Sequence, residues 1–263
     1  MQAVNVPSTR INPDQLHHYR EQGFLIIRGL FDPVEMAVAS WEADRLLERG
    51  SGIQDTNNIR CRWQNHVKTG ECLFETFDPV TDLSPICNQL ARDPRLIGIL
   101  SALYGEPAHL FKDKLIFKPP GAKGYDLHQD FISWPGFPET FITAAIAIDP
   151  CGKDNGATEV FPGYHARGYL SPRDGDYHSL PTSAVDASTG VFLELEPGDV
   201  AVFGCFVPHR SAPNQSDRWR RLLYLSYNAA SDGGDRWAAH YDEFHTWLKK
   251  KYAEYGKHET YFR

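Results

Sequence analysis

The stretch His109-Leu110-Phe111-Lys112-Asp113-Lys114-Leu115-Ile116-Phe117, which ends at Pro119-Pro120-Gly121, is where the periodicity of this sequence changes from helical to extended. Five further short runs rich in β-branched or aromatic residues follow it, each bounded by Pro, Gly, Asn or Asp: residues 140–148, 157–161, 190–195, 199–207 and 222–227. Runs of this length with such boundaries are typical of strands. Because no helical period interrupts them, they predict an antiparallel sandwich or barrel.

Helical patterns flank this strand-rich region on both sides. Before it, helices are predicted over residues 12–23, 34–49 and 84–103, with Asn12-Pro13 as a helix start, a break at Asp93-Pro94, and a short apolar strand at 24–27. After it, residues 235–255 have a helical pattern whose histidines, His240 and His245, are expected at the surface. We therefore predict one domain over residues 1–263, with a mainly helical flank (1–108), an all-β core (109–230) and a C-terminal helix (231–263).

The composition excludes several classes of protein. With 27 Lys and Arg against 34 Asp and Glu, the net charge is 27 − 34 = −7, which argues against a nucleic-acid-binding protein. The five cysteines are widely spaced without a CxxC pair, so we expect reduced thiols rather than disulfides or a zinc site. No apolar run has the length of a signal peptide or a membrane span. We expect a cytoplasmic protein whose partner is a small molecule, with no nucleic acid or membrane.

One short motif in the strand-rich region has the spacing of metal ligands. In Leu127-His128-Gln129-Asp130-Phe131, the side chains of His128 and Asp130 leave the same face of an extended segment. Such a pair also arises by chance as a surface histidine near a solvated aspartate. A third ligand, His209, follows the predicted strand at 199–207. Two imidazoles and one carboxylate form the facial triad of non-haem Fe(II) oxygenases, whose open positions accept a 2-oxo acid and dioxygen.

The far carboxylate of a 2-oxo acid needs a cation at a fixed distance from the metal, and the bidentate fork of arginine suits it best. Arg220 opens the last predicted strand, and a lone surface cation is the alternative interpretation. Arg220, Leu222 and Tyr224 share one face of that strand, whereas Arg221 points to the other face. Only one of the two arginines can therefore bind the 2-oxo acid.

Several segments together resemble the phytanoyl-CoA dioxygenase family of Fe(II)/2-oxoglutarate oxygenases over about residues 10–230. They are His128-Gln129-Asp130, the run from Asn155 to His165, the turn Glu196-Pro197-Gly198-Asp199-Val200, and His209-x-Ser211 with Asn214 and Arg220. The resemblance implies a double-stranded β-helix (a cupin-like jelly roll) with flanking helices. It assigns Fe(II) to His128, Asp130 and His209. It assigns the distal carboxylate of 2-oxoglutarate to Arg220 with help from Ser211, and implies O2 as cosubstrate.

The residues that contact the substrate are predicted from charge and aromatic character. Asn57, Arg60, Arg62 and His66 form a polar, cationic cluster that we place in a loop over the barrel mouth, with a solvated basic loop as the alternative. Lys112 and Lys114 share a face of the strand that precedes the His128 motif. If functional, these cations would clamp a phosphonate or carboxylate. Phe131 and Trp134 are candidates for an aromatic wall against which an ammonium group could lie.

Taken together, these features predict an enzyme that hydroxylates an unactivated C–H bond with release of succinate and CO2. Asp130 stands where the related halogenases have Ala or Gly, so the resemblance implies a hydroxylase. Within the family, residues 112–139 are most similar to oxygenases of small zwitterions, and 2-aminoethylphosphonate-type hydroxylases are the expected group. The alternatives are a hydroxylase of an acyl-CoA, a betaine or an amino-acid-like substrate, and a non-catalytic, metal-containing jelly-roll binding module.

Overall fold

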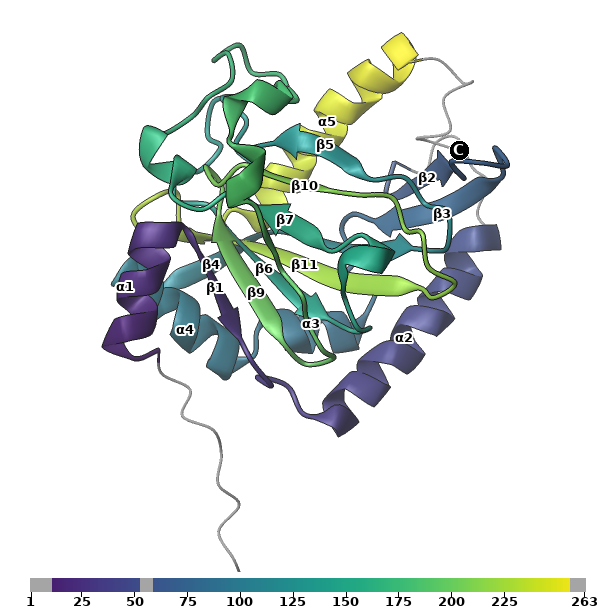
Figure 1. Cartoon of the computed structure of the whole chain (residues 1–263), viewed down its shortest axis with the longest axis horizontal. Coiled ribbons are helices and arrows are strands. Elements are labelled where there is room, and N and C mark those ends of the chain that lie inside the picture. Colours follow the sequence, from purple (N-terminus) through teal and green to yellow (C-terminus); the bar gives the residue numbers. More distant parts are fainter. Residues whose placement is uncertain (1–10, 53–58, 256–263) are drawn as a thin grey trace, which may run out of the picture.

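Two antiparallel sheets form the centre of the computed structural model, which describes residues 11–52 and 59–255 (Figure 1). The larger sheet has seven strands in the order β1 (Phe24–Ile27), β9 (Val200–Gly204), β6 (Ile142–Ala147), β11 (Arg220–Ala229), β4 (Ala108–Lys118), β3 (Cys72–Phe77) and β2 (Cys61–Asn65). The smaller sheet has four strands in the order β5 (Tyr125–His128), β10 (His209–Ser211), β7 (Thr158–Val160) and β8 (Val191–Phe192).

The larger sheet buries both of its faces. Along β11, Leu222 and Tyr224 point inward and pack with Val160 of the smaller sheet. Leu223 and Leu225 point outward into the core that the sheet shares with the helices. This alternation follows from the two-residue period of a strand, and it leaves one interior face enclosed between the two sheets. The predicted jelly roll with flanking helices is confirmed.

The helices lie within three residues of their predicted bounds. They are α1 (Pro13–Gln22), α2 (Pro33–Gly52), α3 (Pro85–Ala91), α4 (Pro94–Tyr104) and α5 (Trp237–Tyr255). Asn12 caps α1 by accepting a hydrogen bond from the Gln15 amide at 2.8 Å, and Gly23 ends it with a φ of 82°. The predicted break at Asp93-Pro94 separates α3 from α4, because Asp93 caps the new helix. In the part of the chain that the structure describes, no helix combines the length and apolar character needed to cross a membrane.

The helical flank contains two strands that the sequence analysis missed. β2 and β3 extend the larger sheet beyond β4, so the predicted loop is wrong for residues 61–65. The sequence of β2 does not look like a strand, because both faces of this edge strand are buried and one of them carries polar residues. Cys61 and Trp63 enter the outer core, while Arg62 and Gln64 are buried polar side chains. Asn57 lies outside the described residues.

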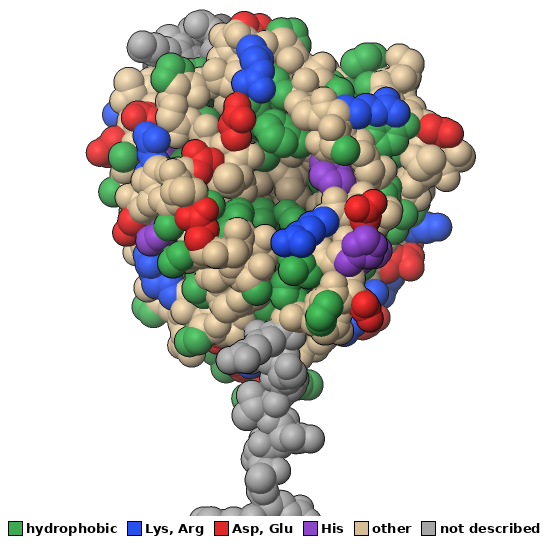
Figure 2. Space-filling view, turned by 90° about the vertical axis from the view of Figure 1, so that its left-hand side faces the viewer, with side chains coloured by type: hydrophobic (Ala, Val, Ile, Leu, Met, Phe, Trp, Pro, Cys, Tyr) green, Lys and Arg blue, Asp and Glu red, His purple; other side chains and the backbone are tan. Residues whose placement is uncertain are grey.

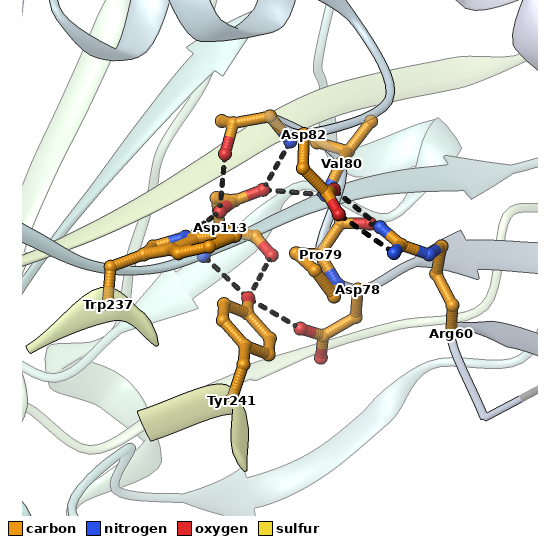
Figure 3. Close-up of polar contacts among 9 residues, drawn as sticks. Arg60, Asp78, Pro79, Val80, Asp82, Asp113, Trp237 and Tyr241 are labelled. Carbon is orange, nitrogen blue, oxygen red and sulfur yellow. Dashed lines mark hydrogen bonds and ion pairs between the residues drawn. The ribbon is translucent and has the colours of Figure 1, made fainter. Parts of the chain in front are cut away.

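Helix α5 closes one end of the larger sheet. The Tyr241 hydroxyl donates to the main-chain carbonyl of Asp113 at 2.7 Å, and the Trp237 indole donates to the Asp113 carboxylate at 2.6 Å (Figure 3). The expected surface position of His240 is wrong: it is 2% exposed and stacks on Phe244. Its spacing of three and four residues from Trp237 and Phe244 places it on the packed face of the helix. His245 is half-buried rather than exposed.

Candidate active site

Three candidate metal ligands meet where the smaller sheet faces β6. His128 ends β5 and pairs directly with His209 at the start of β10, while Asp130 follows in the next loop. The Nε2 atoms of both histidines lie 3.6 Å from Oδ1 of Asp130. Each of the three side chains offers one ligand atom, and these atoms lie within 4.8 Å of one another. The structure therefore brings together the three side chains that the sequence analysis selected.

Hydrogen bonds fix the orientation of all three side chains. Nδ1 of His128 donates to the Asp126 carbonyl at 2.7 Å, and Nδ1 of His209 donates to the Val207 carbonyl at 3.0 Å, a tautomer assigned from these partners. Each Nε2 lone pair is then free to face Asp130. The Thr143 hydroxyl holds the other carboxylate oxygen at 3.0 Å. Two imidazole nitrogens and one carboxylate oxygen, each supported by an outer hydrogen bond, fit a non-haem iron ion.

The electrostatics of this cluster favour the protonation states that a metal requires. Burial, with a contribution from His128, lowers the pKa of His209 to about 4. Burial alone would raise the pKa of Asp130, but the neighbouring imidazoles of His209 and His128 and the charge of Lys114 hold it below its ordinary value. At neutral pH the site therefore offers a neutral His209 and a carboxylate, which are the forms that bind metal ions.

Two buried basic side chains lie deeper in the barrel, at the paired ends of β4 and β11. Arg220 is 1% exposed and donates to the Gly156 carbonyl at 2.8 Å, and its Nε has no partner. Nζ of Lys118 lies 3.3 Å from the same carbonyl and 3.0 Å from the Ser211 hydroxyl. Neither cation pairs with a carboxylate among the residues that the structure describes. Because buried charges need a counter-charge, these groups fit the carboxylate of a ligand.

Lys118 is a residue of this cluster that the sequence analysis missed. Burial, together with the charge of Arg220, lowers the pKa of Lys118 to about 6. The spacing of the lysines in β4 could have predicted its position. Lys112, Lys114 and Lys118 are separated by even numbers of residues, so all three share the interior face of the strand.

The two adjacent arginines of β11 have separate roles in the structure. Arg221 lies on the outer face, where it pairs with Asp149 at 2.7 Å and with Asp44 of α2 at 2.6 Å. Arg220 lies on the interior face. The predicted alternation of these two side chains is confirmed.

The upper part of the interior face carries Lys112 and Lys114. Nζ of Lys112 lies 3.3 Å from an oxygen of Asp78 and 4.1 Å from the centre of the Phe244 ring, and burial lowers the pKa of Lys112 to about 8. Lys114 is half-buried over the Tyr224 ring at 5.4 Å. Within the described residues, Lys114 has no hydrogen bond and no ion pair of its own.

The predicted cationic cluster of the helical flank is largely engaged with acidic partners. Arg60 pairs with Asp82 at 2.5 Å and donates to the Pro79 carbonyl at 2.9 Å (Figure 3). Arg62 is buried and pairs with Asp78. Arg60 therefore fixes the segment after β3, whereas Arg62 belongs to the buried group of charges around Lys112.

The two aromatic residues predicted to form a wall beside the substrate, Phe131 and Trp134, pack against other aromatic side chains. Phe131 packs edge-on against Tyr169 at 5.0 Å, and Trp134 packs against Phe244 and Trp247 of α5. The sequence analysis missed Tyr177, which is 47% exposed although its ring centre lies 5.6 Å from that of His128. Figure 2 shows a hollow on this side of the molecule, with hydrophobic side chains along its rim and histidine and cationic side chains beside it.

Comparisons with known proteins agree with this geometry. A family model described as phytanoyl-CoA dioxygenase (PhyH) matches residues 19–222. The methylphosphonate hydroxylase of Gimesia maris is 33% identical over 171 residues, which cover 63% of this chain but only 61%, less than two thirds, of that protein. A 2-aminoethylphosphonate dioxygenase from an uncultured bacterium is 27% identical over 230 residues, covering 85% of this chain and 84% of that protein. The apo structure of EctD from S. alaskensis has the same fold, with a TM-score of 0.71 and 22% identity over 89% of this chain and 83% of that one.

Proposed function

The chain belongs to the phytanoyl-CoA dioxygenase family, and from that premise we propose that it hydroxylates a small zwitterionic organophosphonate of the 2-aminoethylphosphonate type. As a member of this family it is an Fe(II)- and 2-oxoglutarate-dependent dioxygenase. Bound iron supplies the oxidising chemistry that couples decarboxylation of 2-oxoglutarate to hydroxylation of a C–H bond. The protein supplies the geometry, the charges and the exclusion of water.

In this proposal, His128, Asp130 and His209 hold the iron. The fixed tautomers of both histidines and the hydrogen bond from Thr143 support that role. Arg220, Ser211 and Lys118 hold the distal carboxylate of 2-oxoglutarate, because they gather a buried guanidinium, a hydroxyl group and a buried amine with no carboxylate paired to them in the described residues.

The phosphonate class of substrate is supported by two independent lines. Two of the relatives act, by their names, on methylphosphonate and 2-aminoethylphosphonate. The observation that carries the proposal is the Lys114 ammonium group, which has no ion pair in the described residues and lies over the Tyr224 ring at 5.4 Å, on the interior face of the larger sheet. An anionic substrate inside the barrel would meet this cation.

A substrate panel tests the proposal. The purified chain, supplied with Fe(II) and 2-oxoglutarate, is offered 2-aminoethylphosphonate, methylphosphonate, glycine betaine, a free amino acid and an acyl-CoA, and succinate formation above the substrate-free rate is measured. We expect stimulation by the phosphonates and its loss in His128→Ala and Asp130→Ala. Stimulation by the betaine, the amino acid or the acyl-CoA alone would overturn the phosphonate assignment, and unchanged turnover in both variants would overturn the ligand assignment.

A further inference from the structure

Gln129 lies between two candidate metal ligands in the sequence, and its side chain is 2% exposed. Its amide nitrogen donates to the main-chain carbonyls of Gly168 at 2.9 Å and Phe206 at 2.7 Å. Its amide oxygen accepts from the main-chain amide of Leu170 at 2.7 Å. A side-chain amide offers two donors and one acceptor oxygen, so these bonds satisfy the buried group and tie two distant segments together.

The Phe206 carbonyl belongs to the loop between β9 and β10, which holds the metal ligands. The carbonyl before it accepts from the Asp130 amide at 3.1 Å. The carbonyl after it accepts from Nδ1 of His209 at 3.0 Å. Gln129 is therefore bonded to the same short loop that fixes Asp130 and His209.

The other segment that Gln129 holds runs beside the metal-ligand motif, and we call residues 168–180 the strap. At the far end of the strap, Ser179 forms a β-bridge with His128. Between the two ends, the Gly175 amide donates to the Ser133 hydroxyl at 3.1 Å. The strap is therefore tied to the motif, or to residues just after it, at both ends and in the middle.

Tyr177 of the strap borders the opening to the metal ligands. Its ring centre lies 5.6 Å from that of His128, and the residue is 47% exposed. The side chains of His128 and Asp130 are 11% and 19% exposed, so solvent reaches the ligands beside this ring. A substrate that comes to the metal from solvent therefore passes Tyr177.

Resting on the dioxygenase activity and, for the choice of substrate, on the proposed function, we infer that Gln129 is a positioning residue. It fixes the strap, and with it Tyr177, beside the metal ligands, so that the strap forms a wall of the substrate site. Without the Gln129 amide, the strap loses its bonds at Gly168 and Leu170. Asp130 keeps its bond from Thr143. Substrate affinity should therefore fall, while the binding of iron and 2-oxoglutarate stays intact.

Hydrogen exchange tests the contact between Gln129 and the strap without a substrate. The full chain is loaded with Fe(II) and 2-oxoglutarate under nitrogen, and amide exchange is followed by mass spectrometry. In Gln129→Met we expect the Leu170 amide to exchange at least about tenfold faster, because it loses its acceptor. The Leu180 amide, which donates to the Leu127 carbonyl at 2.6 Å, should keep its rate. Unchanged exchange at Leu170, or equal acceleration at Leu180, would overturn the inference.

Turnover tests whether Gln129 acts through Tyr177. With 2-aminoethylphosphonate as substrate, Gln129→Met should raise KM about fivefold, the effect expected for loss of one aromatic contact. The visible charge-transfer band of the anaerobic complex with Fe(II) and 2-oxoglutarate should be unchanged. Adding Tyr177→Ala to Gln129→Met should raise KM no further, because both changes remove the same contact. Additive effects on KM, or a weakened band in Gln129→Met, would overturn the inference.

Asn228→Leu is the matched control. Asn228 is also a buried amide that donates to main-chain carbonyls, at 2.9 and 3.0 Å in the loop after β11, and its loss should leave KM and Leu170 exchange unchanged. If Gln129→Met fails to fold, Gln129→Glu has the same size but cannot donate to both carbonyls, and an unchanged KM in that variant overturns the inference. If 2-aminoethylphosphonate is not turned over, the proposed function fails, and Leu170 exchange alone decides the role of Gln129.

Discussion

The Thr143 hydroxyl donates to Oδ2 of Asp130 at 3.0 Å, and this bond leaves Oδ1 to face both histidines. Thr143 is buried on the interior face of β6. Its position is set by the sheet, while Asp130 lies in a loop. Thr143 on strand β6 therefore fixes the orientation of Asp130, a candidate metal ligand that lies on a loop.

Replacing Thr143 by valine removes this bond with little change in volume. Loss of an outer hydrogen bond to a metal ligand typically costs about ten- to a hundredfold in metal affinity, so we expect Thr143→Val to bind Fe(II) at least about tenfold more weakly. Anaerobic metal titration measures the effect. Thr143→Ser, which keeps the hydroxyl group, is the matched control and should bind like wild type. Equal affinities for all three proteins would show that Asp130 needs no such support.

Arg220 and Arg221 offer a matched pair of substitutions. Arg220→Ala should raise the 2-oxoglutarate concentration needed for half-maximal turnover at least about tenfold, because a charge-assisted bidentate contact is lost. Arg221→Ala should leave that requirement unchanged but lower the free energy of unfolding by about 2–3 kcal/mol, because Asp149 loses its buried partner. Enzyme assays and urea unfolding separate the two effects. A raised 2-oxoglutarate requirement in Arg221→Ala, with an unchanged requirement in Arg220→Ala, would contradict the assignment of Arg220 to the interior face and Arg221 to the outer face.

Local periodicity was sufficient to predict much of this fold and site. The two-residue period of a strand separates Arg220 from Arg221. The same period predicted that His128 and Asp130 share a side, and the structure brings them together although Asp130 lies in the loop after β5. The helix signals at Asn12 and Asp93 are side-chain caps, which act within a few residues. Each of these predictions depends on contacts between near neighbours in the sequence.

The missed features depend on contacts between distant residues. β2 carries Arg62 and Gln64 on a buried face because Asp78 and Glu75 of the neighbouring chain segment accept their hydrogen bonds. The sequence alone does not say that such partners are present, so a buried polar strand looks like a loop. Similarly, Tyr177 lies beside His128 because the Leu180 amide bonds to the Leu127 carbonyl at 2.6 Å.

The affinity for 2-oxoglutarate should depend on pH through Lys118. Its pKa is about 6 without a ligand, and a carboxylate partner raises it, so binding takes up a proton at any pH between the two values. Affinity should therefore fall as the pH rises from about 6 to about 8, by at most tenfold per pH unit. Lys118→Met should bind more weakly but with a smaller pH dependence. Calorimetry in buffers of different ionisation enthalpy counts the protons, and equal slopes in both proteins would exclude Lys118.

The Tyr241 hydroxyl links α5 to β4, the strand that carries the buried lysines, and to the segment after β3. It donates to the Asp113 carbonyl and lies 2.9 Å from Asp78, and it accepts from the Asp113 amide at 3.0 Å (Figure 3). Tyr241→Phe removes this hydrogen-bond partner from the buried amide and carbonyl of Asp113, so the free energy of unfolding should fall by about 1–3 kcal/mol. Urea unfolding measures the loss. Trp219→Phe, at an exposed position, is the control, and equal stabilities of the two variants would mean that the α5 contact contributes nothing.

Tyr177 should determine how tightly substrate consumption is coupled to 2-oxoglutarate consumption. The segment that carries it is tied to β5 by the bridge between Ser179 and His128, and its ring remains 47% exposed beside His128. A substrate at the metal would cover that ring. Tyr177→Ala removes an aromatic contact of about 1 kcal/mol, which corresponds to about a fivefold higher KM. It also admits water, so more succinate should form per molecule of hydroxylated product. Tyr177→Phe keeps the ring and should keep the ratio, and an unchanged ratio in Tyr177→Ala would place the substrate elsewhere.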